Sequence, residues 1–302
     1  MTTDAPIDPT RTLPATINRL VAAAEALAAL TVHLGGLTGE LSLDPETARR
    51  VAALAETIVD LDGVDPLILR THGAMGRTML AQATAFAATP GEPGSWAIKD
   101  PFVLQALGRG SSAFAARIVS HIAPSIPGFS DAIGREHARV LDVGAGVGEL
   151  AMEFARHLPS ATVVGLDVWA PAIELAEANV RAAGLQDRVE VRNQDISTFV
   201  DAEGFDLVWF AGPFIPGALQ PIGLERCVAA MRPGAWLVYG AYGGGDALTN
   251  ALGDLRTLRS GGPVLTTPEI EDLLRSAGLV DVQAAPGSIG IVSRTVVGRR
   301  PE

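Results

Sequence analysis

The stretch at 140–150, Val-Leu-Asp-Val-Gly-Ala-Gly-Val-Gly-Glu-Leu, is the part of the sequence that most restricts the fold. An apolar run predicts a buried strand, and Gly144, Gly146 and Gly148 follow it at alternate positions before a helical pattern begins. Glycine lets the backbone turn tightly and lets a ligand approach without a Cβ in the way. A strand, a glycine turn and a helix in this order predict a ligand site at the edge of a parallel sheet.

Short β-rich runs alternate with helical stretches from residue 139 onward. Alternation of this kind predicts parallel strands joined by crossover helices. Two further runs, Val280–Ala284 and Ile289–Val297, are separated only by a Pro-Gly turn and predict a closing antiparallel hairpin. We therefore expect an α/β fold with a mostly parallel, doubly wound sheet. The expected parallel strands are 139–143, 162–167, 188–192, 205–210 and 235–240.

The first part of the chain has a different sequence pattern, with helical periodicity and few strand-like runs. A linker marked by Pro124, Pro127 and Gly128 follows it, so we expect an all-helical domain at 1–130 and the α/β domain at 131–302. The apolar stretch Leu20–Leu37 is rich in alanine and contains Glu25 and His33. We interpret it as a buried helix of a soluble protein.

Composition limits the partners of this chain. The net charge is -11 and no basic run is present, so the chain would repel a phosphate backbone, and a small molecule is the expected partner. The single cysteine, Cys227, excludes an intrachain disulfide and suits a cytoplasmic location. No basic leader is visible, no membrane partner is expected, and no cluster has the spacing of metal ligands.

Three acidic residues each follow a predicted strand. Asp142 precedes the glycine turn, where it would repel a diphosphate but could bind a cationic amino group. Asp167 comes 19 residues after Gly148, close to the place of a ribose-binding carboxylate. Asp195 follows the third strand and could accept from a purine amine. Each could instead be an ordinary turn or capping residue, so it is the ordered set that favours a nucleoside site.

This set of motifs resembles the class I, S-adenosylmethionine-dependent methyltransferases. The resemblance rests on Val140–Gly148, Asp167, Asp195-Ile196, Phe205–Val208 and Met231–Ala235, and covers about 139–300. It implies a seven-stranded sheet with S-adenosyl-L-methionine across the carboxyl ends of the strands. The cofactor-binding residues expected here are Asp142, Gly144, Ala145, Gly146, Gly148, Asp167, Val168, Asp195, Ile196, Phe210 and Arg109.

The N-terminal helices followed by this domain resemble, more narrowly, the small-molecule O-methyltransferase group. That group carries a His-Asp pair after the fourth strand, with the histidine as base. Here the stretch 211–216 reads Ala-Gly-Pro-Phe-Ile-Pro and holds no titratable side chain. It only half resembles the Asn-Pro-Pro-aromatic motif of amine- and amide-methylating enzymes, because the asparagine is missing.

A missing base leaves three possibilities: a base elsewhere, an acceptor that is already ionised, or a neutral amine. His72 and Tyr242 are the candidate catalytic residues. We expect an enzyme that methylates a small molecule at oxygen, nitrogen or carbon, with the helical domain covering the substrate and forming a homodimer. The alternatives are a cofactor-binding regulatory protein without turnover and a nicotinamide-dependent oxidoreductase.

Overall fold

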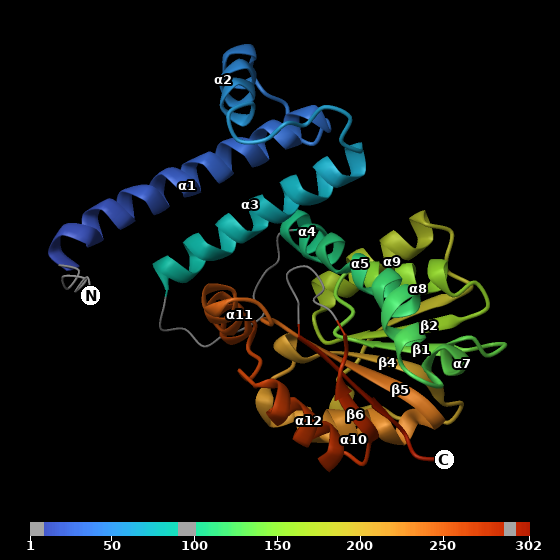
Figure 1. Ribbon diagram of the computed structural model, residues 1–302. Coiled ribbons are helices and arrows are strands. Elements are labelled where there is room, and N and C mark those ends of the chain that lie inside the picture. Colours follow the sequence, from blue (N-terminus) through green and yellow to red (C-terminus); the bar gives the residue numbers. More distant parts are fainter. Residues whose placement is uncertain (1–8, 90–100, 287–293) are drawn as a thin grey trace. The chain divides into compact units, whose positions relative to one another are not determined.

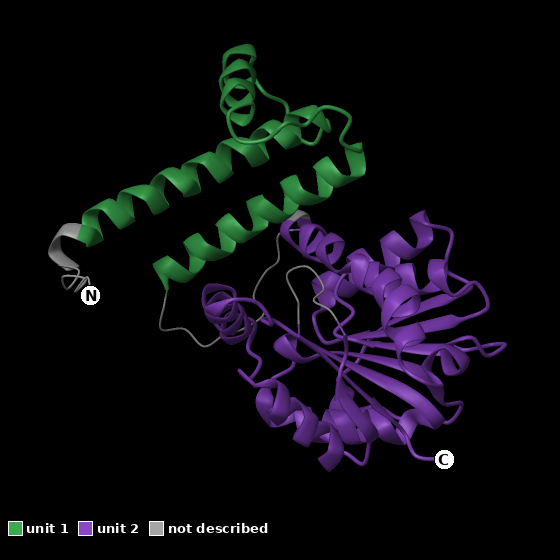
Figure 2. Cartoon of the chain, viewed as in Figure 1, with its two compact units in different colours: residues 1–90 green, residues 91–302 purple. Residues whose placement is uncertain are grey.

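The computed structural model describes residues 9–89, 101–286 and 294–302 (Figure 1). The chain divides into two compact units, residues 1–90 and 91–302 (Figure 2). The domain boundary predicted from the sequence lies near residue 130. The compact units divide earlier because the helices after residue 100 pack on the sheet of the second unit.

The first unit consists of α1 (Pro9–Leu37), α2 (Pro45–Ala55) and α3 (Pro66–Ala88). The Asp44 carboxylate caps α2 by accepting hydrogen bonds from two backbone amides of the first turn. Arg77 of α3 joins the helices, because its guanidinium donates to the Thr31 carbonyl of α1 at 2.7 Å and to the Glu40 carboxylate at 2.6 Å. The Arg77–Glu40 ion pair is largely withdrawn from solvent.

Helix α1 is buried only toward its carboxyl end, where Thr31 and Leu34 are 2% and 6% exposed. Its first half is exposed, with Leu13 and Leu20 both at 61%, so the expectation of a buried helix is wrong there. Among the described residues, α1 is the one helix whose length and apolar composition would suffice to cross a membrane. Core helices of soluble proteins can meet the same criterion, so length and composition alone carry little weight.

Five short helical segments lead into the sheet of the second unit. Aromatic stacking fixes two of them: Phe114 stacks on Trp209 with ring centroids 5.4 Å apart, and Phe129 stacks on Trp236 at 5.0 Å. Both tryptophans lie on sheet strands, so these segments belong to the α/β unit. The segments are α4 (Pro101–Ser111), α5 (Ala113–Arg117), the π-helical turn η1 (Ile118–Ile122), α6 (Ala123–Ser125) and α7 (Phe129–Ile133).

The sheet has seven strands in the order β3-β2-β1-β4-β5-β7-β6. The first five are parallel, and β7 pairs antiparallel with both β5 and β6. This confirms the predicted fold; residues 287–293, which include Gly287 of the predicted turn and the first part of the predicted strand Ile289–Val297, lie outside the described residues. The strands are β1 (Arg139–Val143), β2 (Thr162–Asp167), β3 (Val189–Asn193), β4 (Phe205–Ala211), β5 (Met231–Ala241), β6 (Val280–Ala284) and β7 (Arg294–Arg299).

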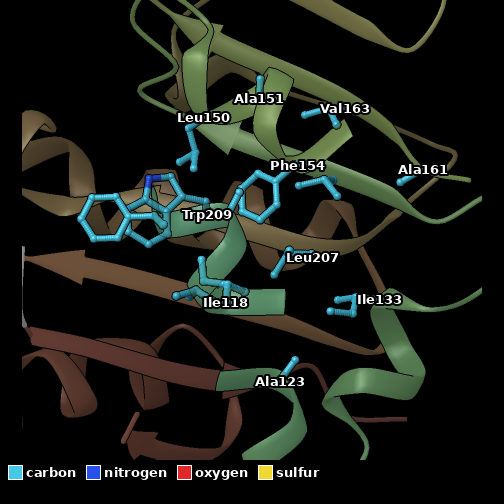
Figure 3. Close-up of a cluster of buried hydrophobic side chains, with 14 of the residues drawn as sticks. Ile118, Ala123, Ile133, Leu150, Ala151, Phe154, Ala161, Val163, Leu207 and Trp209 are labelled. Carbon is cyan, nitrogen blue, oxygen red and sulfur yellow. The ribbon is translucent and has the colours of Figure 1, made fainter. Parts of the chain in front are cut away.

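Helices cover both faces of the sheet (Figure 1). On one face Ile118, Phe154, Leu207 and Trp209 form part of a buried cluster that η1 and α8 share with the strands (Figure 3). A second cluster on the other face holds residues of α10 and α12. The remaining elements are α8 (Glu149–His157), α9 (Ala170–Ala182), η2 (Ile196–Thr198), η3 (Gly212–Phe214), η4 (Gly217–Leu219), α10 (Gln220–Ala230), α11 (Ala247–Ser260) and α12 (Thr267–Ser276).

Asp206 is a fully buried carboxylate at the amino end of β4. It accepts hydrogen bonds from the guanidinium groups of Arg135 at 2.9 Å and Arg232 at 2.6 Å, and from the Arg139 amide at 2.9 Å. Paired charges of this kind tolerate burial because each oxygen is satisfied. The amino edge of the sheet is therefore closed by structural ion pairs.

Candidate functional site

The glycine turn joins the carboxyl end of β1 to α8. Gly144, Gly146 and Gly148 have φ angles of +85°, +55° and +78°, a backbone conformation that side chains with a Cβ rarely adopt. The amides of Gly144 and Ala145 donate to the Leu166 carbonyl at 2.9 and 3.0 Å. These hydrogen bonds fasten the turn to the end of β2, and the glycines at alternate positions allow the backbone conformation that the turn needs.

Asp167 ends β2 and holds the turn in place with its side chain. One carboxylate oxygen accepts from the Gly146 amide at 2.8 Å, and the other accepts from the Trp169 amide at the same distance. Burial raises the pKa of this carboxyl. Each oxygen has a second lone pair, so the group can still accept from two ribose hydroxyls. The next residue, Val168, is 63% exposed beside it.

Asp142, the acid before the turn, is 0% exposed, and within the described residues neither carboxylate oxygen has a close hydrogen-bond partner; the Ala151 backbone amide of α8 is the one group that lowers the pKa of this carboxyl. Burial is the main reason that its pKa rises to about 7, and the nearby Asp167 carboxylate adds to the shift. A buried polar group without a partner is costly and is a feature of binding sites. A cationic amino group would satisfy both oxygens.

Asp195 and Ile196 follow β3. The Asp195 side chain accepts from the Ser197 amide at 2.8 Å and caps η2, while Ile196 is buried against Gly223 of α10. The two neighbouring strand ends are also tied together, because the Asn193 amide group donates to the Asp167 carbonyl at 3.2 Å. Asp195 therefore has the capping role that the sequence left open as an alternative, beside its expected contact with a purine.

The strand order sets the sequence of these groups along the carboxyl edge. Asp195 lies beyond β3, Asp167 at β2, and Asp142 at β1, next to β4. On the β4 side, a Cβ added to Gly144 would come within 3.2 Å of the Ala211 Cβ. This order matches a purine, a ribose and an amino group in turn, so the residues present fit S-adenosylmethionine. Apart from Gly146 and its two chain neighbours, no described residue has an atom within 4 Å of where a Gly146 Cβ would sit, which leaves the turn open to a ligand.

Helix α4 covers the glycine turn from outside the sheet. A Cβ at Gly108 would lie 2.2 Å from Val147 of the turn. Gln105 of α4 and Asn179 of α9 exchange side-chain hydrogen bonds at 2.9 and 3.1 Å, and Asn179 also donates to the Val147 carbonyl at 2.9 Å. Sequence reasoning missed this pair, because nothing in the pattern links residues 74 positions apart.

Arg109 lies in the last turn of α4, close to Glu149, the first residue of α8. Burial raises the pKa of Glu149, and the Arg109 charge partly offsets this shift. Its Nε is buried and has no hydrogen-bond partner among the described residues. The structure therefore places Arg109 near the start of α8, and its expected contact with the cofactor stays a prediction.

Phe210 was expected to contact the cofactor, but the structure places its ring in the core. It is 0% exposed and stacks on Tyr239 of β5 with centroids 5.5 Å apart. Tyr239 in turn donates its hydroxyl hydrogen to Gln220 Oε1 at 2.8 Å. The Gln220 amide group donates to the carbonyls of Gly212 at 2.8 Å and Ile215 at 3.1 Å. Buried hydrogen bonds from Gln220 therefore hold the loop after β4 in place.

The two candidate catalytic residues lie in different units. His72 is exposed on α3, and its Nδ1 lies 2.9 Å from the Ile68 carbonyl one turn earlier. Tyr242 follows β5, is 9% exposed, and packs edge-on against Phe214 with centroids 6.1 Å apart. Burial raises the pKa of Tyr242 to about 12, so its phenol stays protonated at neutral pH.

The part of the chain that the structure describes offers neither a metal site nor a reactive cysteine. It contains no group of three or more His, Cys, Asp or Glu side chains that could hold a metal ion. The Cys227 thiol is free and fully buried, and burial raises its pKa, which makes it a poor nucleophile.

Comparison with known proteins identifies the domain that contains this site. Residues 140–234 match the family model described as a methyltransferase domain. A tRNA1(Val) (adenine(37)-N6)-methyltransferase of Phocaeicola vulgatus is 34% identical over 90 residues, which is 30% of this chain and 38% of that protein. The chain thus spans less than half the length of this curated relative.

Solved structures resemble the fold over nearly the whole chain. An O-methyltransferase family protein from Burkholderia thailandensis superposes with a TM-score of 0.66 at 16% identity, covering 99% of both chains. Human N-acetylserotonin methyltransferase, solved in complex with S-adenosylmethionine, gives a TM-score of 0.69 at 17% identity and covers 99% of this chain and 100% of its own. The family match shows that residues 140–234 carry a methyltransferase domain, and the fold of the whole chain is the one that these solved methyltransferase structures share.

Proposed function

We propose that this protein transfers the methyl group of S-adenosylmethionine to a small molecule. The observation that carries the proposal is the buried Asp142 carboxylate, whose oxygens have no close hydrogen-bond partner within the described residues, next to an open glycine turn fastened by Asp167. Burial of an unpaired carboxyl destabilises the protein, unless a bound ligand donates hydrogen bonds to that carboxyl.

Each acidic side chain would bind one part of the cofactor. Asp142, once ionised, would accept from the ammonium group of the methionine portion. Asp167 would accept from the ribose hydroxyls, and Asp195 from the purine amine. When bound, the cofactor supplies a methyl carbon on a good, neutral leaving group, so most of the protein's contribution is positioning.

Two observations favour a small molecule over a nucleic acid. The net charge of -11 opposes binding of a phosphate backbone. The RNA-modifying relative matches less than a third of this chain, whereas the O-methyltransferase family protein matches its whole length, helical first unit included.

A cofactor-binding protein without turnover is the second candidate. The observation that favours it is the stretch 211–216, which has no titratable side chain where a base is expected. Binding of the cofactor without methylation of any hydroxyl, amine, thiol or carboxylate acceptor would support this candidate.

Calorimetric titration with S-adenosylmethionine and S-adenosylhomocysteine tests the proposal. We expect saturable binding, and at least about tenfold weaker binding in Asp142→Ala and in Asp167→Ala, since each removes charged hydrogen-bond acceptors. Asp272→Ala, an exposed acid on α12, is the matched control and should bind as the wild type does. Unchanged affinity in both site variants, or binding of NADH in place of these nucleosides, would contradict the assignment.

A further inference from the structure

Two helices, α4 and α9, pack directly on the glycine turn. A Cβ added to Gly108 of α4 would lie 2.2 Å from Val147 Cγ2, and a Cβ added to Gly148 would lie 3.2 Å from the Ala176 Cβ of α9. Leu104 of α4 and Val147 are 3% and 2% exposed and belong to one buried apolar cluster. The packing of the turn therefore depends on two helices that carry none of the three acids expected to bind the cofactor.

A pair of side-chain amides joins these two helices beside the turn. Gln105 Nε2 donates to Asn179 Oδ1 at 2.9 Å, and Asn179 Nδ2 donates back to Gln105 Oε1 at 3.1 Å. Asn179 Nδ2 also donates to the Val147 carbonyl at 2.9 Å. An amide nitrogen has two hydrogens, so both are used here and the orientation of the Asn179 side chain is determined. Both side chains are half-buried, where water competes less for these hydrogen bonds.

The hydrogen bond from Asn179 fixes a peptide group that could otherwise rotate. The peptide after Val147 leads into Gly148, which has a φ of +78°, and glycine adopts positive and negative φ about equally readily. A flip of this peptide would exchange the positions of its carbonyl and its amide without steric cost at Gly148. In the structure both groups are held, the carbonyl by Asn179 and the Gly148 amide by the Ala145 carbonyl at 2.9 Å. Asn179 therefore selects one form of the turn.

Val147 also carries the turn amide that remains for a ligand. The other four amides of 144–148 donate to groups at the end of β2 or within the turn. Within the described residues, the Val147 amide has no hydrogen-bond partner. An unpaired amide in a turn that is open at the neighbouring Gly146 can donate to a bound molecule. Because Asn179 holds the carbonyl of the same residue, it also restrains the direction of this N–H group.

We propose that Asn179 is a positioning residue for the cofactor, supported by Gln105, and that it holds the Val147–Gly148 peptide in the form that binds S-adenosylmethionine. The inference rests on the proposed methyl transfer, which supplies the ligand. Asn179 acts through the turn and touches no reacting atom. Without its hydrogen bond the turn would populate a second form, and the affinity for the nucleoside would fall with the fraction of the binding form.

Four variants separate this role from a general effect on stability. Asn179→Asp keeps an acceptor for Gln105 but has no N–H group for the Val147 carbonyl. Asn179→Leu breaks the same hydrogen bond without adding a charge. Gln105→Met removes the support and leaves the Asn179 donors in place. Arg188→Gln is the structural control, because the Arg188 guanidinium donates to backbone carbonyls at the other end of α8.

Calorimetric titration with S-adenosylhomocysteine measures the effect of each variant on binding. We expect binding to weaken about tenfold or more in Asn179→Asp and in Asn179→Leu, and about two- to fivefold in Gln105→Met. Arg188→Gln should bind as the wild type does, although it should melt at a lower temperature. If the Asn179 variants do not fold, the comparison of Gln105→Met with Arg188→Gln decides the question.

Nuclear magnetic resonance can observe the peptide itself. Isotope labels on valine carbonyl carbons and glycine nitrogens restrict a carbonyl-correlated amide spectrum to valine–glycine pairs. The sequence has four such pairs, which end at Gly144, Gly148, Gly165 and Gly298. Val147→Ile removes one signal and so assigns Gly148. We expect the Gly148 signal to shift or split in Asn179→Asp and to return toward its wild-type position with saturating S-adenosylhomocysteine, while the distant Gly298 signal stays in place.

Wild-type affinity in both Asn179 variants, or an unchanged Gly148 signal in Asn179→Asp, would overturn the inference while the cofactor site stands. Equal weakening of binding in Arg188→Gln would also overturn it, since the effect would then follow stability alone. Failure of the wild type to bind S-adenosylhomocysteine would instead overturn the proposed function, and the inference with it.

Discussion

The Asp167 carboxylate accepts a hydrogen bond from the Gly146 amide at 2.8 Å, so the acid expected to bind ribose also holds the glycine turn. A residue with both roles couples the shape of the turn to the presence of the ligand. Substitutions within the turn should therefore affect ligand binding more than stability.

Gly146→Ala tests this coupling against Gly184→Ala. Both glycines have positive φ, +55° and +66°, and apart from each glycine and its two chain neighbours, no described residue has an atom within 4 Å of the Cβ that would be added. We expect both variants to lose about 1–2 kcal/mol of stability in urea titrations, from backbone strain alone. Only Gly146→Ala should also bind S-adenosylhomocysteine more weakly, by about tenfold or more. Equal binding by the two variants would mean that the nucleoside does not approach the turn.

The raised pKa of Asp142 predicts a pH dependence of stability. The folded protein keeps this proton up to about pH 7, while the unfolded chain loses it near the ordinary value of 3.8. Between these values the folded state binds more protons, so this group makes the free energy of unfolding fall as the pH rises. Asp142→Asn should remove that part of the slope, measured by urea titrations at pH 5, 6 and 7.

The same carboxyl predicts proton release on binding. An ammonium group beside Asp142 would favour the ionised carboxylate and lower its pKa. Calorimetry at pH 6.5 in two buffers with different ionisation enthalpies should report up to about one proton released per S-adenosylhomocysteine bound. Asp142→Asn should lower that number, and an unchanged number would show that another group releases the proton.

Gln220 and Tyr239 should stabilise the loop after β4 as a unit. Gln220→Leu removes the donor to two backbone carbonyls and leaves the buried Tyr239 hydroxyl without its partner, so we expect a loss of about 2–4 kcal/mol. Tyr239→Phe removes one bond and should lose about 1–2 kcal/mol. The double variant should lose less than the sum, as expected for contacting residues in a double-mutant cycle. Additive losses would contradict the shared network.

The Asp206 cluster predicts a purely structural effect. Asp206→Asn removes the charge that faces Arg135 and Arg232 at the amino edge of the sheet, so we expect about 3–5 kcal/mol of destabilisation. Because this edge is opposite the glycine turn, the affinity for S-adenosylhomocysteine should stay within about twofold in protein that remains folded. Melting curves and calorimetry on the same sample separate the two effects.

The sequence predicted most of the sheet and the acids at its strand ends. Those features depend on local patterns, namely an apolar run, a glycine turn and a charged residue at a fixed distance, as at Asp142 and Asp167. The alternation of strand and helix then determined the parallel order, and the last two strands were recognisable because no helix separates them.

Features that depend on long-range packing were not predictable. Strand β4 is buried along its whole length, so its sequence does not alternate between polar and apolar residues. Without such an alternation, the sequence does not indicate that Phe210 faces the core instead of a ligand. The contact of Gln220 with Tyr239 joins two elements that only the fold brings together. The early division of the chain at residue 90 arises in the same way, since Phe114 and Phe129 stack on tryptophans of distant strands.

Strand β7 is synthesised after the other six strands of the sheet but lies inside it, between β5 and β6. Until it is made, β6 has no neighbour to pair with, and Tyr242 and Leu265 lack the Arg294 guanidinium that ties them together. The strands that carry the three carboxylates need none of this, so the nucleoside half of the pocket could assemble during synthesis. The half that would meet the acceptor is completed only when β7 has been made.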